Sequence, residues 1–488
     1  MGMVKMAATI DQDGSGGHVC DENCGADCDH GHDHSHTHEN IDEIGGDGTS
    51  DAAPVFVDDY TAILYYTQND NLRWNGGVAV GTQTVVTYSF TDTADLPALA
   101  DYDPYEADAY WSYTEAQRTL MRQVMDKYEA VSGLKFVEVQ GEGMINIMGA
   151  DVSGVGGWAN VAQAYNNEAG TGYFVNAYQN QAEGAYGYQV NLHELGHALG
   201  LQHPFEGNVQ LNSGSDNQDN TVMTYNIDNP YTTELGTFDV QAMQEIYGAA
   251  GSFDNWRVTV SASDVVTIKT TFADQADVVV ATNVDTVIKT YNGDDTLVGR
   301  QGNDTLNGGK GDDTITGAEG RDFILGNQGN DLIYGDINDV DYTGLVNDID
   351  RIYGNTGNDT IYGGRSVDVL NGGIGDDVLY GGNGNDRLRG SDGNDTIYSG
   401  DGDDRITGGA GNDVFVFQVT DQNELNKITD FTSGEDLVDM SFWGFTSLNQ
   451  FTLTQVGDHV LMEYSTWIDI GFLNTQIADL SNSDFIFA

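Results

Sequence analysis

Cysteine and proline are scarce in this sequence of 488 residues, and each scarcity excludes a class of protein. All 3 cysteines lie between positions 20 and 28, so no disulfide framework can hold the rest of the chain together. Only 5 prolines accompany 63 glycines, which excludes a collagen-like chain and favours a glycine-rich repeat over a flexible linker. Stability must therefore come from packing and from bound ions.

Positive charge is also scarce. The chain has 18 Lys and Arg against 77 Asp and Glu, which gives a formal net charge of −59. Such a chain repels nucleic acids and anionic membranes and attracts multivalent cations, of which calcium is the obvious candidate. We therefore expect no nucleic-acid partner. Disorder is the usual consequence of high charge, but 39% hydrophobic residues provide enough material for folded cores.

Long hydrophobic runs are absent as well. No stretch approaches the roughly 20 apolar residues that a membrane-spanning helix needs, so we expect no transmembrane segment. Near the start, only Met3 to Ile10 is weakly apolar, and it lacks a proper hydrophobic region and a cleavage site. We therefore expect no signal peptide for the general secretory pathway.

The most informative segment is His193-Glu-Leu-Gly-His197-Ala-Leu-Gly200-Leu-Gln-His203. His193 and His197 are four residues apart, so a helix places both imidazoles on one face, spaced to bind one metal ion. Glu194 lies beside that face and can reach a metal-bound water as a general base without being a ligand. Gly200 allows the chain to leave the helix and return His203 as a third ligand. Three ligands leave one position of a zinc ion open to water.

A short H-E-x-x-H sequence is also compatible with an ordinary amphipathic helix bearing surface histidines. The extended form, H-E-x-x-H-x-x-G-x-x-H, is the metzincin signature, which also requires a methionine turn downstream. The segment Thr221-Val-Met223-Thr-Tyr225 supplies that turn, 20 residues beyond His203.

On these residues the sequence resembles the serralysin family of secreted bacterial zinc proteases. The resemblance covers roughly residues 60 to 250, from the Trp-Asn-Gly that ends at Gly76 to the Tyr-Gly that ends at Gly248. It implies an α+β metzincin catalytic domain. It also implies that Met223 underlies the metal and that Tyr225 is a further, displaceable zinc ligand that can stabilise the oxyanion.

Local patterns between these points predict the elements of this domain. Thr114 is a suitable N-cap for a long amphipathic helix that ends before Gly133, and residues 238–248 form a closing helix. Strands are expected at 83–90, 134–139 and 144–148.

A nine-residue period follows the joining strands expected at 253–290. Copies of G-G-x-G-x-D-x-U-x, the calcium-binding RTX nonapeptide, run about a dozen times from Tyr291 to Phe417. Unrelated Asp-Gly hairpins would not keep a fixed period. Each glycine half forms a turn, each Asp directs a carboxylate into it, and each aliphatic U residue faces inward, so an all-β parallel roll with several structural Ca²⁺ ions is predicted. The predicted calcium ligands are Asp295, Asp304, Asp313, Asp322, Asp331, Asp359, Asp377, Asp386, Asp395, Asp404 and Asp413.

Two copies of the repeat are irregular. An insertion at 337–347 is expected to loop off the roll, and the copy that ends in Asp368 lacks its third glycine. We therefore leave Asp368 out of the predicted ligand set.

The chain is expected to divide into four parts: a leader at 1–57, a catalytic domain at 58–252, joining strands and roll at 253–417, and a cap at 418–488. Its last residues, Asp484-Phe-Ile-Phe-Ala488, resemble the acidic-then-apolar end by which serralysins leave the cell through a type I channel. Secretion by type I machinery is therefore expected.

The leader is rich in metal ligands. It is interpreted as a metal-binding tract or a removable pro-segment, and an alternative is that one thiolate occupies the catalytic zinc and holds a zymogen latent. Its ligands are Cys20, Cys24, Cys28, His18, His30, His32, His34, His36 and His38.

Together these features predict a secreted, calcium-dependent, monomeric zinc endopeptidase acting on proteins or peptides. One alternative is a catalytically reduced RTX protein that binds a surface or matrix. A second, an RTX lipase, is disfavoured because no G-x-S-x-G nucleophile elbow is found.

Overall fold

The structure is a computed structural model of the whole chain. It describes residues 54–64, 73–75, 78–92, 109–151, 157–159, 172–176, 178, 181–207, 209–227, 230–251, 253, 256–270, 275–336, 348–417, 424–464 and 468–488. The metal-binding and latency hypotheses for the leader, and the expected loop at 337–347, lie outside these residues.

A mixed sheet forms the base of the N-terminal part of the molecule. Its order is β4-β2-β5-β7-β6, with β3 pairing β5. The pairs β2–β4, β2–β5 and β5–β7 are parallel, whereas β6 runs antiparallel to β7 at one edge. The strands are β2 (Thr84–Phe90), β3 (Ala109–Trp111), β4 (Leu134–Glu138), β5 (Ile145–Asp151), β6 (Gly157–Ala159) and β7 (Gly172–Asn176).

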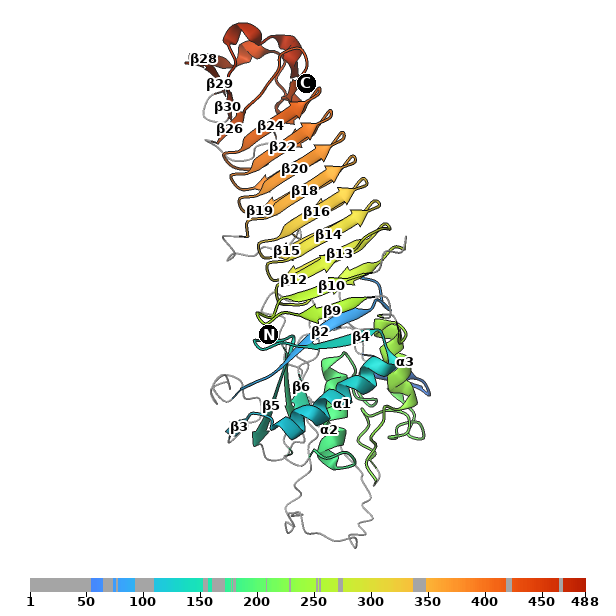
Figure 1. Cartoon of the computed structure of the whole chain (residues 1–488). Coiled ribbons are helices and arrows are strands. Elements are labelled where there is room, and N and C mark those ends of the chain that lie inside the picture. Colours follow the sequence, from blue (N-terminus) through green and yellow to red (C-terminus); the bar gives the residue numbers. More distant parts are fainter. Residues whose placement is uncertain are drawn as a thin grey trace.

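Three helices lie together beside this sheet (Figure 1): α1 (Glu115–Val131), α2 (Tyr186–Ala198) and α3 (Thr237–Tyr247). A capping box between Thr114 and Gln117 starts α1, as its N-cap residue predicts. Its buried face includes Met121 and Tyr128, which join a core that contains Leu195 of α2. Every residue of α2 from Gly187 to Ala198 is buried, so this helix runs through the interior.

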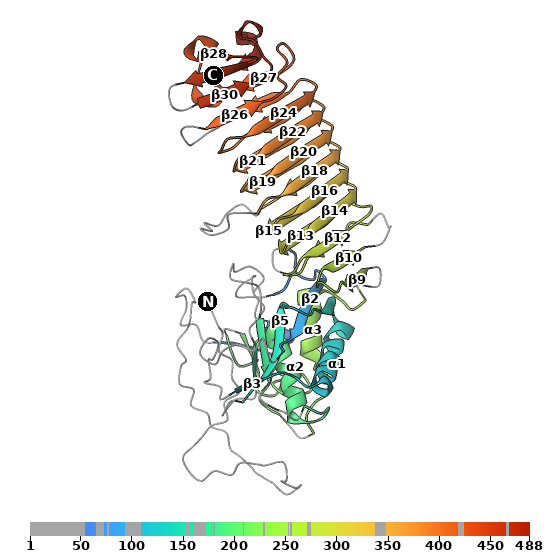
Figure 2. The ribbon, with the colours of Figure 1, turned by 60° about the vertical axis from the view of Figure 1, so that its left-hand side comes forward.

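The C-terminal part is a long roll of two sheets, whose strands are stacked one after another along its length in Figure 2. From β10 to β25, successive strands alternate between the sheets, and each strand pairs in parallel with the strand two positions on. The larger sheet contains β28 (Thr452–Val456), β29 (His459–Tyr464), β30 (Ile468–Phe472), β26 (Leu425–Ile428), β24 (Arg405–Ala410), β22 (Arg387–Asp392), β20 (Val369–Ile374), β18 (Arg351–Thr356), β16 (Phe323–Gln328), β14 (Thr305–Lys310), β12 (Thr286–Lys289), β10 (Val266–Lys269) and β9 (Arg257–Val260).

The facing sheet is built in the same way. It contains β11 (Val278–Val280), β13 (Thr296–Gln301), β15 (Thr314–Glu319), β17 (Leu332–Tyr334), β19 (Thr360–Arg365), β21 (Val378–Asn383), β23 (Thr396–Tyr398), β25 (Val414–Val416), β27 (Leu437–Asp439) and β31 (Phe485–Ile486). The expected parallel β-roll is therefore present, and its sheets continue beyond Phe417 through β26, β27, β30 and β31.

One aliphatic side chain per strand fills the roll. Leu297, Ile315 and Ile333 follow one another along one sheet, and each is 0% exposed. Each sheet contributes a single layer of side chains to this core, so the apolar layer between the two sheets is thin. The U position of the nonapeptide provides that layer.

The two parts of the molecule share contacts. The Asp264 carboxylate, at the start of the roll, accepts hydrogen bonds from the backbone N–H groups of Gln140 and Gly141 at 2.8 and 2.7 Å. The Thr87 hydroxyl of β2 donates to Asn283.

The remaining elements are β1 (Val55–Val57), which pairs with β8 (Val209–Leu211), and short 3-10 helices at Tyr60–Ile63, Ser441–Trp443, Leu448–Gln450, Ile477–Asp479 and Asn482–Asp484. No helix within the described ranges is long and apolar enough to cross a membrane.

Candidate metal centre and catalytic site

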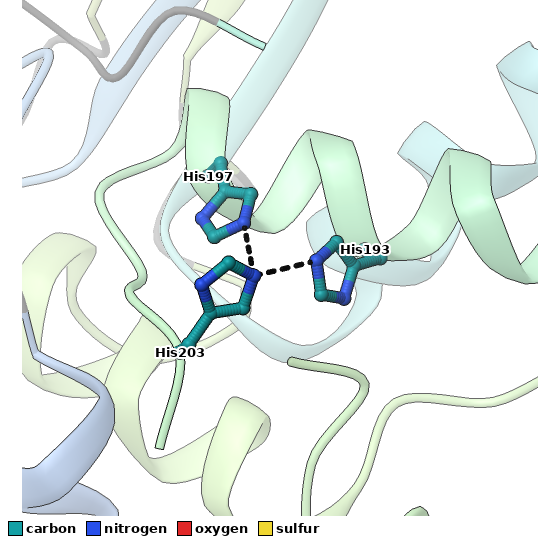
Figure 3. Close-up of side chains that lie close together, drawn as sticks. All are labelled: His193, His197 and His203. Atoms are coloured by element: carbon teal, nitrogen blue, oxygen red, sulfur yellow. Dashed lines mark hydrogen bonds between the residues drawn. The ribbon is translucent and has the colours of Figure 1, made fainter. Parts of the chain in front are cut away.

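The helix α2 and the turn after it bring three histidines together. His193 and His197 project from the same face of α2, and Gly200 leaves the helix with φ of 98°. The N–H of Leu201 bonds back to the Gly196 carbonyl at 2.9 Å, which closes the helix end. The reversed chain then places His203 opposite the other two histidines (Figure 3).

The distances between the imidazoles fit one tetrahedral metal ion. Nε2 of His203 lies 3.1 Å from Nε2 of His193 and 3.1 Å from Nε2 of His197. Zinc–nitrogen bonds of about 2.0–2.1 Å in a tetrahedron separate ligand atoms by about 3.3 Å, close to the spacing found here.

The opposite ring nitrogens fix how each imidazole is oriented. Nδ1 of His193 lies 2.8 Å from the Val222 carbonyl, and Nδ1 of His197 lies 2.8 Å from the Leu201 carbonyl. Because a carbonyl can only accept, both Nδ1 atoms carry the proton and both Nε2 lone pairs face the centre. Nδ1 of His203 lies 3.0 Å from Oε1 of Glu206, which favours the same tautomer.

Burial keeps the two histidines of α2 neutral. Burial, reinforced by the neighbouring His203, lowers the pKa of His193 to about 3. The pKa of His197 also falls well below its ordinary value, chiefly because of burial. Neutral imidazoles are the form that binds metal, so His193 and His197 need no deprotonation near neutral pH.

Glu194 lies next to the triad on the same helix and is 3% exposed. Burial raises its pKa well above the ordinary value, although a hydrogen bond from the backbone of Ala159 in β6 opposes that shift. Its Oε2 has no hydrogen-bond partner among the described residues. A buried carboxylate held on one side, with one oxygen left over, suits proton transfer better than structural support.

The methionine turn lies directly beneath the helix. Met223 is 0% exposed, and a Cβ built on Gly196 would lie 2.5 Å from its sulfur. The turn is held by the buried carboxylate of Asp239 in α3, which accepts hydrogen bonds from the Thr221 hydroxyl at 2.6 Å and the Val222 N–H at 2.8 Å. Asp239 therefore supports the carbonyl that orients His193.

The repeats present a second kind of site, formed by rows of buried aspartates. In each row, Oδ1 accepts the backbone N–H of the aspartate one turn earlier, as Asp331 does from Asp313 at 2.9 Å. The Oδ2 atoms of the row have no hydrogen-bond partner among the described residues. A Cβ on Gly308 would lie 2.1 Å from Oδ2 of Asp313, so only glycine leaves room for that oxygen. Buried, unpartnered carboxylate oxygens are the ligands that calcium prefers.

Comparison with known proteins gives two matching families. The RTX calcium-binding nonapeptide repeat matches in 4 copies, at residues 289–324, 311–339, 346–379 and 380–415. The reprolysin-like metallopeptidase family M12B matches residues 84–204.

Three serralysins are among the relatives. Serralysin of Proteus mirabilis is 27% identical over 228 residues, which cover 39% of this chain and 45% of the relative. Serralysin A of Dickeya chrysanthemi is 25% identical, and the match covers 37% of this chain and 42% of the relative. Serralysin B of the same organism is 27% identical, and the match covers 42% of this chain and 47% of the relative. The matches span less than half the length of each relative. The chain is similar to the serralysins and combines a reprolysin-like metallopeptidase domain with RTX calcium-binding repeats.

For this serralysin-like chain, the triad and the repeats support Zn²⁺ and Ca²⁺ as the two metals. The structure brings His193, His197 and His203 together with Glu194 alongside. Tyr225 is near them: its ring centroid lies 4.6 Å from that of His203 and 5.8 Å from that of His193. All the predicted calcium aspartates are buried, with relative exposures of 2% or less.

Sequence reasoning missed three residues of these sites. Asp350 and Asp368 are each 0% exposed, and their Oδ2 atoms lack partners in the same way as those of the predicted set. The missing glycine beside Asp368 is replaced by Ser366, which adopts the required positive φ of 79°. The sequence pattern that could have identified both aspartates is an Asp two residues before an inward-facing aliphatic residue. For Asp239, an acidic residue in the first turn of a helix is too common a pattern to indicate its role.

Proposed function

We propose that this chain is a secreted zinc endopeptidase that hydrolyses peptide bonds of extracellular proteins and requires calcium for its folded roll. The proposal rests above all on Glu194, whose unpartnered carboxylate oxygen is buried beside three histidines with converging Nε2 atoms. The relatives that this chain matches are serralysins, which are secreted proteases, and their secretion and the RTX repeats support export of this chain through type I machinery.

The residues divide the chemistry between them. Zinc held by the triad would supply Lewis-acid polarisation of the scissile carbonyl and would lower the pKa of its water. Glu194 accepts the proton of the attacking water and transfers it to the leaving amine. Tyr225, whose ring lies beside His203, donates a hydrogen bond from its hydroxyl to the developing oxyanion and keeps its proton. His193 and His197, whose pKa values burial lowers, stay neutral throughout.

The decisive test replaces the base and keeps the ligands. Glu194→Gln preserves the shape of the side chain but cannot accept a proton, so we expect zinc content to be unchanged and casein hydrolysis to fall at least ~10²-fold. The control is Glu183→Gln, the same change on an exposed residue just before α2. Zinc is measured by atomic absorption and hydrolysis by peptide release.

Two results would contradict the proposal in different ways. Wild-type rates in the Glu194→Gln variant would show that another group is the base. A zinc-loaded, calcium-loaded parent that cleaves no protein would favour the alternative of an RTX protein that binds a surface or matrix.

A further inference from the structure

The outer face of the larger roll sheet carries an unusual distribution of charge. On each strand from β10 to β26, the positions just before and after the buried aliphatic residue point away from the core, and we call them outer positions. In β22, for example, Arg387 and Arg389 flank Leu388, which is 1% exposed. Figure 1 shows these strands side by side as a series of parallel arrows.

Cations from neighbouring strands line up at these positions. Through the strand register, Arg351 is paired with Val369, Val369 with Arg387, Arg387 with Arg405, and Arg405 with Lys427. We define the basic strip as Arg351, Arg387, Arg389, Arg405 and Lys427. The four arginines are exposed and Lys427 is partly exposed. None of the five lies within ion-pair distance of a carboxylate of the described part of the chain.

The positive charge of this face contrasts with the acidic composition of the whole chain. The chain has 77 acidic residues and 18 basic ones, yet the outer positions from β10 to β26 hold no Asp or Glu. Lys269 and Lys289 occupy two more of these positions at the other end of the sheet. The facing sheet is a matched comparison, because its outer positions from β13 to β23 carry uncharged residues such as the stacked Tyr362 and Tyr380. The basic strip is therefore specific to one face.

We propose that the basic strip binds a linear acidic polysaccharide, of the polyuronate class, lying along the axis of the roll. Adjacent strands are about 4.8 Å apart, so the strip offers cations at one or two strand spacings over a length of about 20 Å. An extended sugar chain with one carboxylate per residue repeats at a similar spacing. Each carboxylate can accept two parallel hydrogen bonds from an arginine guanidinium.

Two further observations favour a thin sugar chain. The strip is one or two side chains wide and is bordered by acidic residues such as Asp392, at the end of β22, and Asp403, just before β24. A duplex or an anionic membrane would therefore meet repulsion at its edges. Beside Arg351, the rings of Phe323 and Tyr353 pack with centroids 5.7 Å apart, and Phe323 is 37% exposed. An exposed aromatic pair offers an apolar surface to the C–H faces of sugar rings.

The experiment measures binding of a fluorescently labelled galacturonate hexamer to the full calcium-loaded chain, by anisotropy at low ionic strength. We expect saturable binding that weakens as salt is added, because exposed charges are screened. Arg387→Gln/Arg405→Gln should weaken binding by roughly tenfold, which is about 1.4 kcal/mol for the two exposed contacts together. The matched control is Lys310→Gln/Arg321→Gln, which removes two exposed cations of the same roll, one at the end of β14 and one just before β16, and should change affinity less than about twofold.

Each other outcome overturns the proposal. Absence of binding by the parent chain would remove the site, and equal weakening in both double variants would assign binding to net charge alone. Equal affinity for a labelled single-stranded DNA hexamer would show general attraction of anions. If the strip cations only balance the nearby acid rows, neutralising them will shift the calcium midpoint of folding and leave hexamer binding unchanged. Should the strip variant fail to fold with calcium, Arg389→Gln/Lys427→Gln tests the same strip.

Discussion

Position 196 beside the metal centre has no room for a side chain, and glycine occupies it. It lies on α2 between the two helical zinc ligands in sequence, and the methionine turn packs against it. A Cβ there would lie 2.5 Å from the Met223 sulfur and 3.2 Å from the Tyr128 hydroxyl oxygen. The absence of a side chain therefore lets the turn that holds His193 lie close to the helix.

We expect Gly196→Ala to destabilise the catalytic domain by about 1–3 kcal/mol through overpacking, although alanine favours a helix by about 1 kcal/mol. The turn must shift to make room, so zinc affinity should fall as well. Chemical denaturation and zinc competition measure the two effects. Gly214→Ala is the control, because a Cβ at Gly214 has nothing within 4 Å. Similar stability of the two variants would show that the turn moves freely.

At the scale of elements, the rows of aspartates make the roll depend on ions. Burial raises the pKa of Asp359 and Asp395 to about 6 and that of Asp313 and Asp404 to about 8, against an ordinary value of 3.8. Without calcium, the folded roll therefore holds protons that the unfolded chain releases. Stability of the calcium-free roll is then present at low pH and is lost as pH rises through these folded-state pKa values.

This linkage predicts that the calcium-free protein has more β structure at pH 5 than at pH 8, because the buried carboxyl groups are protonated at pH 5. Calcium should remove the difference, since a bound cation compensates the ionised rows at pH 8. Circular dichroism after dialysis against calcium-free buffer measures it. Greater β content at pH 8 than at pH 5 without calcium would contradict the role given to burial.

Across the whole molecule, the roll and the catalytic domain are not independent bodies. Val85 of β2 belongs to the same buried cluster as the roll aliphatics, and Val137 packs against it. Asp264 adds two hydrogen bonds to residues 140 and 141. Folding of the roll should therefore stabilise the domain that carries the zinc ligands.

We accordingly expect removal of calcium, with zinc held constant, to lower the temperature at which proteolysis is lost by several degrees, as for a change of about 1–2 kcal/mol. Asp264→Ala should lower that temperature in calcium but have little effect without it, since its contact requires a folded roll. Activity after brief heating is the measurement. Equal effects of Asp264→Ala with and without calcium would show that this contact does not transmit the stability of the roll to the catalytic domain.

The sequence by itself determined the features that depend on local spacing. A spacing of four positions places two histidines on one helix face, and a nine-residue period with glycine, aspartate and an aliphatic residue produces a parallel roll. Both patterns act within one or two turns of chain. The capping box at Thr114 is local in the same sense.

Only the tertiary structure decided what depends on distant segments. Val222 and Asp239 orient His193 from outside its helix, and their spacing along the chain carries no signal. Asp350 joins the buried row across the interval in which the period is lost, because its N–H and carboxylate pair with neighbours 18 and 28 residues away. The basic strip likewise exists because strand pairing stacks residues from separate turns, and stacking places like charges on one face although the chain as a whole is acidic.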